Sequence, residues 1–230
     1  REPDLLGATR HGVALDAEAA MDEWLPPVDG RWFLGTSDFC HFKLIDPHTR
    51  EAIWQLQLPP DDPVRAWRFN ADASRLALGT LSGHVHLVAT ADASRVSLPA
   101  SAVATMRWLE FSTDGRTLAG KAEDGTIVAW ELASLRPRTT PLAGGGTDYA
   151  MLRVIGDDLY SAAERSLRSW TLPEQAPFKN VATPAIAQLR NRRQFLNHAF
   201  DVHAASRLLV AGGSDGSIGL WRTAAPTLLP

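Results

Sequence analysis

Two histidines, His84 and His86, lie two residues apart in the segment GHVHL. Alternate residues of a β-strand point to the same face, so the two imidazoles could bind one metal ion. The sequence places no third or fourth ligand beside them. A solvated or partly packed strand face is the simpler interpretation, and we predict no metal and no cofactor.

Two further patterns contain part of a catalytic or phosphate-binding motif but lack its other residues. Cys40 and His41 are adjacent, and adjacent strand residues point to opposite faces, so we expect a buried thiol rather than a nucleophile with its base. The triple glycine Gly144-Gly145-Gly146 has no strand before it, no helix after it and no following lysine. We therefore interpret it as a connection between elements and not as a phosphate-binding loop.

The basic residues Arg190, Arg192 and Arg193 form the only basic cluster, and Phe195 lies close to them in the sequence. Such a cluster can bind phosphate or an acidic partner segment, while the solvated face of a loop or short helix explains it equally well. If this cluster binds a partner, we expect the partner to be a protein rather than a nucleic acid. Nucleic-acid binding there predicts an affinity that falls steeply with added salt.

The overall composition limits the possible partners. The formal net charge is -3, which gives no broad attraction to phosphate backbones or anionic membranes. Nucleic acid is therefore an unlikely partner, and no run of residues is long and apolar enough to suggest a membrane span. One cysteine cannot form an internal disulfide, so a cytoplasmic location is the simpler expectation. Arg1 in place of a methionine suggests a processed chain or a piece of a longer protein.

The elements that must position these side chains form an internal repeat. Five stretches have a turn followed by alternating apolar residues: SDFCHFKLID, TLSGHVHLVA, KAEDGTIVAW, ERSLRSWTL and GGSDGSIGLW. The large residues that end them are Ile45, Val88, Trp130, Trp170 and Trp221, separated by 43, 42, 40 and 51 positions. A second landmark runs in phase with the first: Asp29-Gly30, Asp72, Asp114-Gly115, Asp157 and Ala205-Ser206.

Between these landmarks the hydrophobic period is two. Segments such as RLALGT and RLLVAGG are short, apolar and bounded by Gly, Asp or Ser, which is typical of half-buried strands. Each unit therefore predicts a strand, an Asp-Gly-type turn, a strand, a second tight turn, a strand and a looser fourth strand. Four antiparallel strands in about 40 residues make one propeller blade, so we predict an all-β fold.

The repeat resembles the WD40 family of β-propellers. The segment RWLEFSTDGRTLAGKAEDGTIVAWEL, residues 107–132, carries the family's sequence of apolar strand, F-S-x-D-G turn, apolar strand and D-G-x-I-x-x-W phrase. The units at 200–223 and 64–90 follow the same pattern less closely, and those at 24–58 and 149–172 follow it mainly by phase. The resemblance covers roughly residues 20–225 and implies four-stranded antiparallel blades.

The resemblance also implies particular roles for turn and strand residues. Asp124-Gly125 and Asp215-Gly216 suit turns that need positive φ, while Ile127 with Trp130, and Ile218 with Trp221, are expected to pack between neighbouring sheets. The family's Gly-His pair before the first strand, which binds a turn aspartate, is replaced here by Pro60 and Ala102. We therefore expect that hydrogen-bond network to be incomplete in most blades.

The blade boundaries follow from the period. We expect blades at about 20–60, 61–99, 100–142, 143–183 and 184–230, preceded by an N-terminal segment at 1–19. Two arrangements are open. In the favoured one the chain is the C-terminal part of a larger propeller; in the other, five blades close by themselves with a strand from residues 4–15. The prolines and the AIAQLRNRRQFL run of residues 173–196 suggest a short helix or a long loop between blades.

Residues at or beside the starts of the first strands are the candidate contacts. In the WD40 family this region lines one rim of the central channel and binds partners. The matching residues here are Arg65, Trp67, Arg107 and Tyr149. The loop residues Arg190, Arg192 and Arg193 are further candidate contacts, on the separate ground of their clustered charge. The main hypothesis is thus a non-enzymatic scaffold or sensing module that binds a protein or peptide, within a larger protein of bacterial signalling type.

One alternative is a propeller with a small-ligand or catalytic pocket in its central channel. His84, His86, His198 and the turn aspartates are the only residues available for it.

Overall fold

The computed structural model describes residues 23–25, 33–46, 48–49, 51–99, 104–138, 141–142, 151–163, 166–172, 179–180, 200–203, 206, 208–212 and 218–222. All the regular secondary structure in these segments is β-strand. Within them, no helix has the length and apolar character needed to cross a membrane. The prediction of an all-β fold is confirmed.

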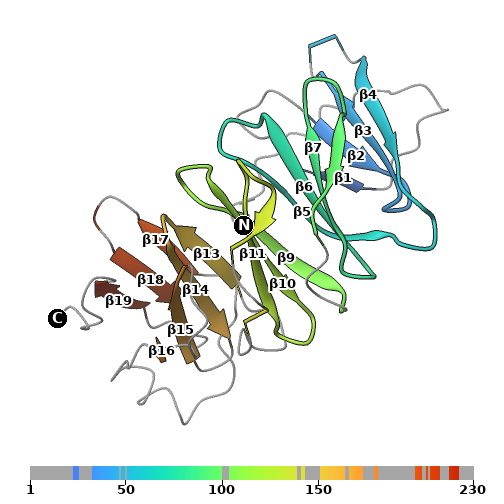
Figure 1. The fold of residues 1–230 in the computed structure, drawn as a ribbon. Helices are drawn as coiled ribbons and strands as arrows, with labels where there is room; N and C mark the ends of the chain where they lie inside the picture. Colours follow the sequence, from blue (N-terminus) through green and yellow to red (C-terminus); the bar gives the residue numbers. More distant parts are fainter. Residues whose placement is uncertain are drawn as a thin grey trace, which may run out of the picture. The chain divides into compact units, whose positions relative to one another are not determined.

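The strands form five antiparallel sheets, which we call blades 1 to 5 in chain order (Figure 1). Blade 1 contains β1 (Glu23–Leu25), β2 (Phe33–Thr36), β3 (His41–Ile45) and β4 (Ala52–Gln57). Blade 2 contains β5 (Val64–Phe69), β6 (Arg75–Thr80), β7 (Val85–Ala89) and β8 (Arg95–Ser97). Blade 3 contains β9 (Met106–Phe111), β10 (Thr117–Ala122), β11 (Ile127–Glu131) and β12 (Arg136–Pro137).

Blade 4 contains β13 (Met151–Ile155), β14 (Asp158–Ala163), β15 (Ser166–Thr171) and β16 (Lys179–Asn180). Blade 5 contains β17 (Phe200–His203), β18 (Leu208–Gly212) and β19 (Ile218–Arg222). In every blade the strands pair in chain order. The chain divides into two compact units, Arg1–Leu58 with blade 1 and Pro59–Pro230 with blades 2 to 5. The N-terminal segment 1–19 lies outside the described residues.

The repeat inferred from the sequence has a common strand register in blades 2 to 5. In each of these blades a leucine of the second strand pairs with the large residue of the third strand. The pairs are Leu76 with Val88, Leu118 with Trp130, Leu159 with Trp170 and Leu209 with Trp221. The second landmark is also confirmed for Asp72, Asp114 and Asp157, which lie in the turns between first and second strands. Equivalent positions of the sequence repeat therefore occupy equivalent positions in blades 2 to 5.

Apolar side chains pack between blades 2 and 3 and between blades 3 and 4. One core joins Ala77 and Leu87 of blade 2 to Leu109 and Trp130 of blade 3. A second core joins Ile127 and other residues of blade 3 to Leu152, Leu159 and Trp170 of blade 4. Ile127 and Trp130 are both almost fully buried and face opposite sides of β11, because they are three residues apart in the strand. Their predicted packing between sheets is confirmed.

The equivalent prediction for Ile218 is wrong. Its side chain is 77% exposed, whereas Ile127 at the same register position in blade 3 is buried. The difference arises because blade 4 covers Ile127, while no described residue covers that face of blade 5. The side chain of Trp221 and the turn at Asp215-Gly216 lie outside the described part of the chain.

The turns between second and third strands share one backbone geometry. Gly125 has a φ of 83° and Gly83 a φ of 88°, values in the left-handed region that glycine adopts without steric cost. The Asp124 carboxylate accepts a hydrogen bond of 2.9 Å from the backbone N–H of Thr126, which fixes the turn. The predicted role of Asp124-Gly125 is confirmed.

Candidate functional site

Arg65 and Arg107 occupy the same irregular position at the start of two neighbouring first strands. In β5, Val64 pairs with Thr80 and Ala66 with Gly79, so Arg65 is an extra residue in the ladder. In β9, Met106 pairs with Ala122 and Trp108 with Lys121, which leaves Arg107 as the extra residue. Both arginines are exposed. Such β-bulges direct side chains out of the sheet and are common beside functional sites.

The two arginines differ in their partners. Arg107 donates a hydrogen bond of 2.9 Å to Glu123, and this bond lowers the pKa of the Glu123 carboxyl. The side chain of Arg65 makes neither a hydrogen bond nor an ion pair with another residue in the described segments. Trp67, two residues further along β5, is half-buried. Tyr149, Arg190, Arg192, Arg193 and His198 lie outside the described residues, as does Gly144-Gly145-Gly146.

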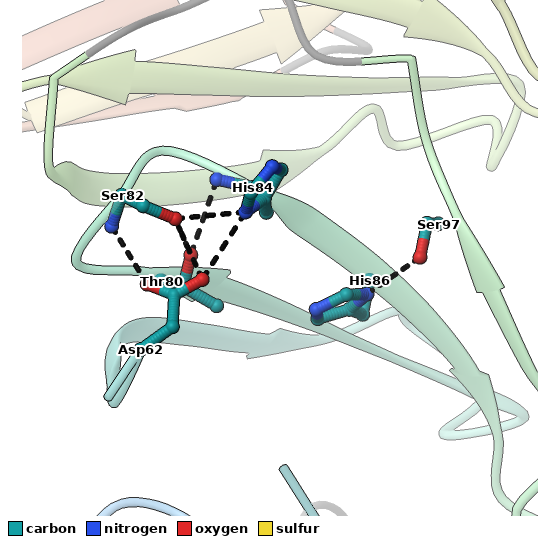
Figure 2. A network of polar contacts seen from close by, with 6 residues as sticks. All are labelled: Asp62, Thr80, Ser82, His84, His86 and Ser97. Carbon is teal, nitrogen blue, oxygen red and sulfur yellow. Dashed lines mark hydrogen bonds and ion pairs between the residues drawn. The ribbon is translucent and has the colours of Figure 1, made fainter. Parts of the chain in front are cut away.

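A polar cluster lies at the same end of blade 2 as Arg65 (Figure 2). Asp62, in the loop before β5, accepts hydrogen bonds from the Ser82 backbone N–H at 2.7 Å and from Ser82 Oγ at 2.6 Å. His84 Nδ1 lies 2.7 Å from Ser82 Oγ and 3.1 Å from Asp62 Oδ2. The His84 backbone N–H donates to Thr80 Oγ1 at 3.1 Å. These bonds tie the loop before the first strand to the turn between the second and third strands.

The cluster lowers the pKa of Asp62 to about 2. Burial alone acts in the opposite direction, but the hydrogen bonds from Ser82, His84 and Thr80 together outweigh it. A carboxylate that accepts several hydrogen bonds is stabilised in its charged form. Asp62 is therefore an ionised structural acceptor and a weak base.

The expectation from Pro60 was an incomplete network, and the structure corrects it for blade 2. The acid is two residues after Pro60, in the loop, and the histidine is in the turn, so the two partners have exchanged places relative to the expected pattern. Sequence reasoning missed this exchange because it searched only for a histidine in the loop. The sequence signal for this pair is an aspartate in the loop, Asp62, followed by a histidine at the next turn, His84. Ala102 lies outside the described part of the chain.

The geometry of this cluster is unlike that of a catalytic triad. In a triad, serine and aspartate bind different nitrogens of the imidazole, so that a proton can pass between them. Here Ser82 and Asp62 both approach Nδ1, and the Ser82 hydroxyl donates its proton to the carboxylate. The arrangement therefore orders a turn. The His84 side chain is 55% exposed.

His86 is partly buried beside the neighbouring strand, and Cys40 is buried in the apolar core. His86 Nδ1 lies 3.0 Å from Ser97 Oγ on the neighbouring strand, and burial lowers the pKa of its imidazole (Figure 2). Cys40 is buried, while the adjacent His41 is exposed and contacts Asp38 at 2.6 Å. Within the described segments no three residues among His, Cys, Asp and Glu are grouped so as to hold a metal ion.

A row of alternating charges crosses the first strands of blades 2 to 5. Arg68, Glu110, Arg153 and Asp201 have the same register, since each pairs with the second-strand residue next to the repeated leucine. Arg68 and Arg153 approach Glu110 Oε2 at 3.3 and 3.5 Å, and Arg153 Nε donates to Asp201 Oδ1 at 3.0 Å. Each interface between these blades thus joins unlike charges. We call these four residues the charge row.

Glu110 is the buried centre of the charge row. Its side chain is 9% exposed, and its Oε2 makes the two ion pairs without a hydrogen bond. Burial raises the pKa of its carboxyl, and the two arginines only partly offset that effect. Sequence reasoning missed the charge row because its members are about 42 to 48 positions apart. Aligning the repeats on the leucine of the second strand would have shown it.

This chain resembles known proteins in fold but not closely in sequence. No family model and no curated protein sequence matches this chain. Among solved structures, U3-55K is 15% identical with a TM-score of 0.65, over 89% of this chain and 62% of that chain. The fold is of the WD40 type. The RRP9 WD40 repeats match with a TM-score of 0.65 at 15% identity over 89% of this chain and 61% of that chain.

The C-terminal WD40 domain of Sif2 matches with a TM-score of 0.64 at 14% identity, over 85% of this chain and 55% of that domain chain. This chain therefore spans about three-fifths of the length of the WD40 structures that it matches. At these identities the likeness concerns the backbone fold. The blades described here have the WD40-type fold.

Proposed function

We propose that this WD40 chain is an interaction module that binds a protein or peptide at the rim where the first strands begin. The observation that carries the proposal is Arg65, an exposed arginine on a β-bulge with no partner among the described residues. Arg107 repeats the same placement one blade further along. Exposed arginines and aromatic residues are frequent energetic anchors of protein interfaces.

The neighbouring elements support this rim as a preorganised surface. The bonds of Asp62 to Ser82 and His84 hold the loop and the turn beside Arg65 in one conformation. A rigid rim loses little conformational entropy on binding, which favours affinity. Trp67 and the exposed His84 extend the same surface. The scaffold role, the signalling context and the contacts of Tyr149, Arg190, Arg192 and Arg193 belong to this proposal as predictions.

The test is to isolate a partner and then measure its affinity for variants. The tagged chain is passed through lysate of its source organism, retained proteins are identified by mass spectrometry, and binding of the purified partner is measured by calorimetry. We expect Arg65→Ala with Arg107→Ala to weaken binding at least about tenfold. Arg116→Ala removes an exposed arginine from a turn at the opposite end of blade 3 and is the matched control.

Two results would overturn the proposal. One is unchanged affinity in the folded double variant together with loss of affinity in Arg116→Ala, which would place the binding surface at the opposite end of the blades. The other is the absence of any specific partner while the purified chain turns over a small substrate, which would favour a pocket in the channel.

A further inference from the structure

We propose that Arg65 and Leu81 form a binding position for an acidic residue of a protein partner, together with an apolar side chain of the same segment. The partner's carboxylate takes the place that Glu123 fills in the neighbouring blade, where it binds Arg107. The inference rests on the proposed binding at this rim and goes further, because it names the chemistry of the segment that binds there.

Leu81 and Glu123 occupy the same position in blades 2 and 3. Each is the first residue of the turn that follows the second strand. The Leu81 backbone N–H donates a hydrogen bond of 2.9 Å to the Pro63 carbonyl. The Glu123 backbone N–H makes the same bond to the Thr105 carbonyl at 2.8 Å. Pro63 and Thr105 each lie two residues before the bulged arginine of their blade, so both turns have the same position relative to that arginine.

Blade 3 shows how a carboxylate binds at this position. The Glu123 carboxylate accepts a hydrogen bond of 2.9 Å from Arg107 Nη2. Both side chains are about half exposed, so the carboxylate reaches the arginine from the solvent side of the rim. Hydrogen bonds between unlike charges are stronger than those between neutral groups. The chain therefore contains an internal example of an acidic residue bound to the bulged arginine.

Blade 2 has the arginine of this pair without the acid. Because position 81 is a leucine, its side chain cannot accept a hydrogen bond from Arg65. Among the described residues, no other side chain replaces the missing acid as a partner of Arg65. The Leu81 residue is 42% exposed, and removing such a side chain from water on binding contributes to affinity. The position therefore matches a segment that offers a carboxylate and an apolar side chain together.

The acidic residues at the same end of the blades favour such a segment over a polyanion. Asp61 and Asp62 lie in the loop before β5, and the pKa of Asp62 is about 2, so it is ionised at neutral pH. Glu123 and Asp124 add two carboxylates in the turn of blade 3. A nucleic acid or an anionic membrane would bring many negative charges against these acids, whereas a single carboxylate on Arg65 does not. We therefore assign the position to a protein segment.

The test begins with a random peptide library displayed on phage and selected on the full chain and on Arg65→Ala. The selected peptides are synthesised, and their affinities for both proteins are measured by calorimetry. We expect peptides with an aspartate or glutamate next to an apolar residue, which bind the parent chain at least about tenfold more tightly than Arg65→Ala. Replacing the peptide's acid by the corresponding amide should remove this difference.

The substitution Leu81→Glu should act as an internal competitor. It supplies in blade 2 the carboxylate that blade 3 already has, so it should occupy Arg65 and weaken peptide binding at least about tenfold. Leu81→Gln has the same size without the charge and is the matched control, which should weaken binding less. A second measurement needs no partner. The pKa of the introduced carboxyl, followed by NMR, should be lower beside Arg65 than in the Arg65→Ala background, because the arginine stabilises the charged form.

The results that would overturn the inference can be separated from a failure of the proposed function. Selected peptides that bind through Arg65 without an acidic residue would contradict the inference and leave the rim as the binding surface. Equal weakening by Leu81→Glu and Leu81→Gln, or an introduced carboxyl whose pKa is independent of Arg65, would show that position 81 does not face the arginine. Failure to select any peptide that prefers the parent chain over Arg65→Ala would also overturn it. The affinity of the lysate partner for the double arginine variant then decides the proposed function separately.

Discussion

The side chain of Met106 occupies the space that a Cβ atom at Gly79 would need. A Cβ built on Gly79 lies 2.8 Å from Met106 Cβ, closer than real side chains approach. Met106 belongs to the first strand of blade 3 and Gly79 to the second strand of blade 2, so this contact sets the distance between two blades. The glycine is therefore required by packing against the next blade, and not by a turn.

The substitution Gly79→Ala should destabilise the protein by about 2 kcal/mol, because an added methyl group overpacks a fully buried site. Urea unfolding of the purified chain measures the effect. Combining Gly79→Ala with Met106→Ala provides the control, since removing the methionine side chain opens the space. The double variant should lose less stability than the two single variants added together. Strict additivity would contradict the assigned contact.

Replacing Glu110 by glutamine should leave the stability at pH 7 unchanged or raise it by about 1 kcal/mol, because a buried ion pair often costs more in desolvation than it returns. The sign follows from the pKa, which burial raises above 4.5 in the folded protein. A carboxyl with a raised folded pKa contributes stability below its unfolded pKa and loses it as the pH rises through the folded value. The advantage of Glu110→Gln should therefore disappear near pH 4. A clear loss of stability at pH 7 would contradict this account.

Truncating Arg153 should have the opposite effect on the same ion pairs. Among the described residues, Arg153→Met leaves Glu110 with one cation and Asp201 with none, and we expect a loss of about 2 kcal/mol at pH 7. Arg68→Met should cost less, because the Arg68 side chain is 46% exposed against 16% for Arg153. Chemical denaturation measures both. Adding Glu110→Gln to Arg153→Met should recover part of the loss, and a double variant without recovery would argue against the charge row.

Asp62→Asn should destabilise the protein by about 2 kcal/mol at neutral pH, because charged hydrogen bonds to Ser82 and His84 are lost. The pKa of Asp62 is about 2 in the folded protein, below its ordinary value of 3.8. A lowered folded pKa contributes stability above the unfolded pKa, and this contribution is lost as the pH falls through the folded value. The deficit of Asp62→Asn should thus shrink between pH 4 and pH 2. His84→Ala, at an exposed position, is the milder control.

Two copies of the pentapeptide A-D-A-S-R allow a paired test of turn strain. Ala73 and Ala93 have φ values of 57° and 58° at the same position of residues 71–75 and 91–95. Ala93→Gly should stabilise the protein by about 0.5 kcal/mol, because glycine removes the left-handed strain at a half-exposed site. Ala73→Gly should be less favourable by about 0.8 kcal/mol, since it also deletes a buried methyl group. Thermal unfolding compares them, and equal shifts would refute the assigned burial effect.

The repeat could be predicted from the sequence because its physical causes are local. Strand alternation and tight turns depend on neighbouring residues, so the landmarks Val88, Trp130 and Trp170 indicated the third strand of each blade correctly. The turn at Asp124-Gly125 was predictable for the same reason. The candidate contacts Arg65 and Arg107 were selected by position along the first strand. Only the register showed that both are bulged residues in equivalent places.

The sequence by itself determined the all-β class, the period of the blades and the turn residues, since each depends on residues adjacent in the chain. The tertiary structure decided what depends on distant residues. It brought Glu110 between Arg68 and Arg153, joined Asp62 to His84 and left Ile218 exposed while burying Ile127. The physical reason is that burial and ion pairing arise between side chains 22 to 42 residues apart in the chain, within a blade or between blades. A local pattern contains no information on which neighbour is present.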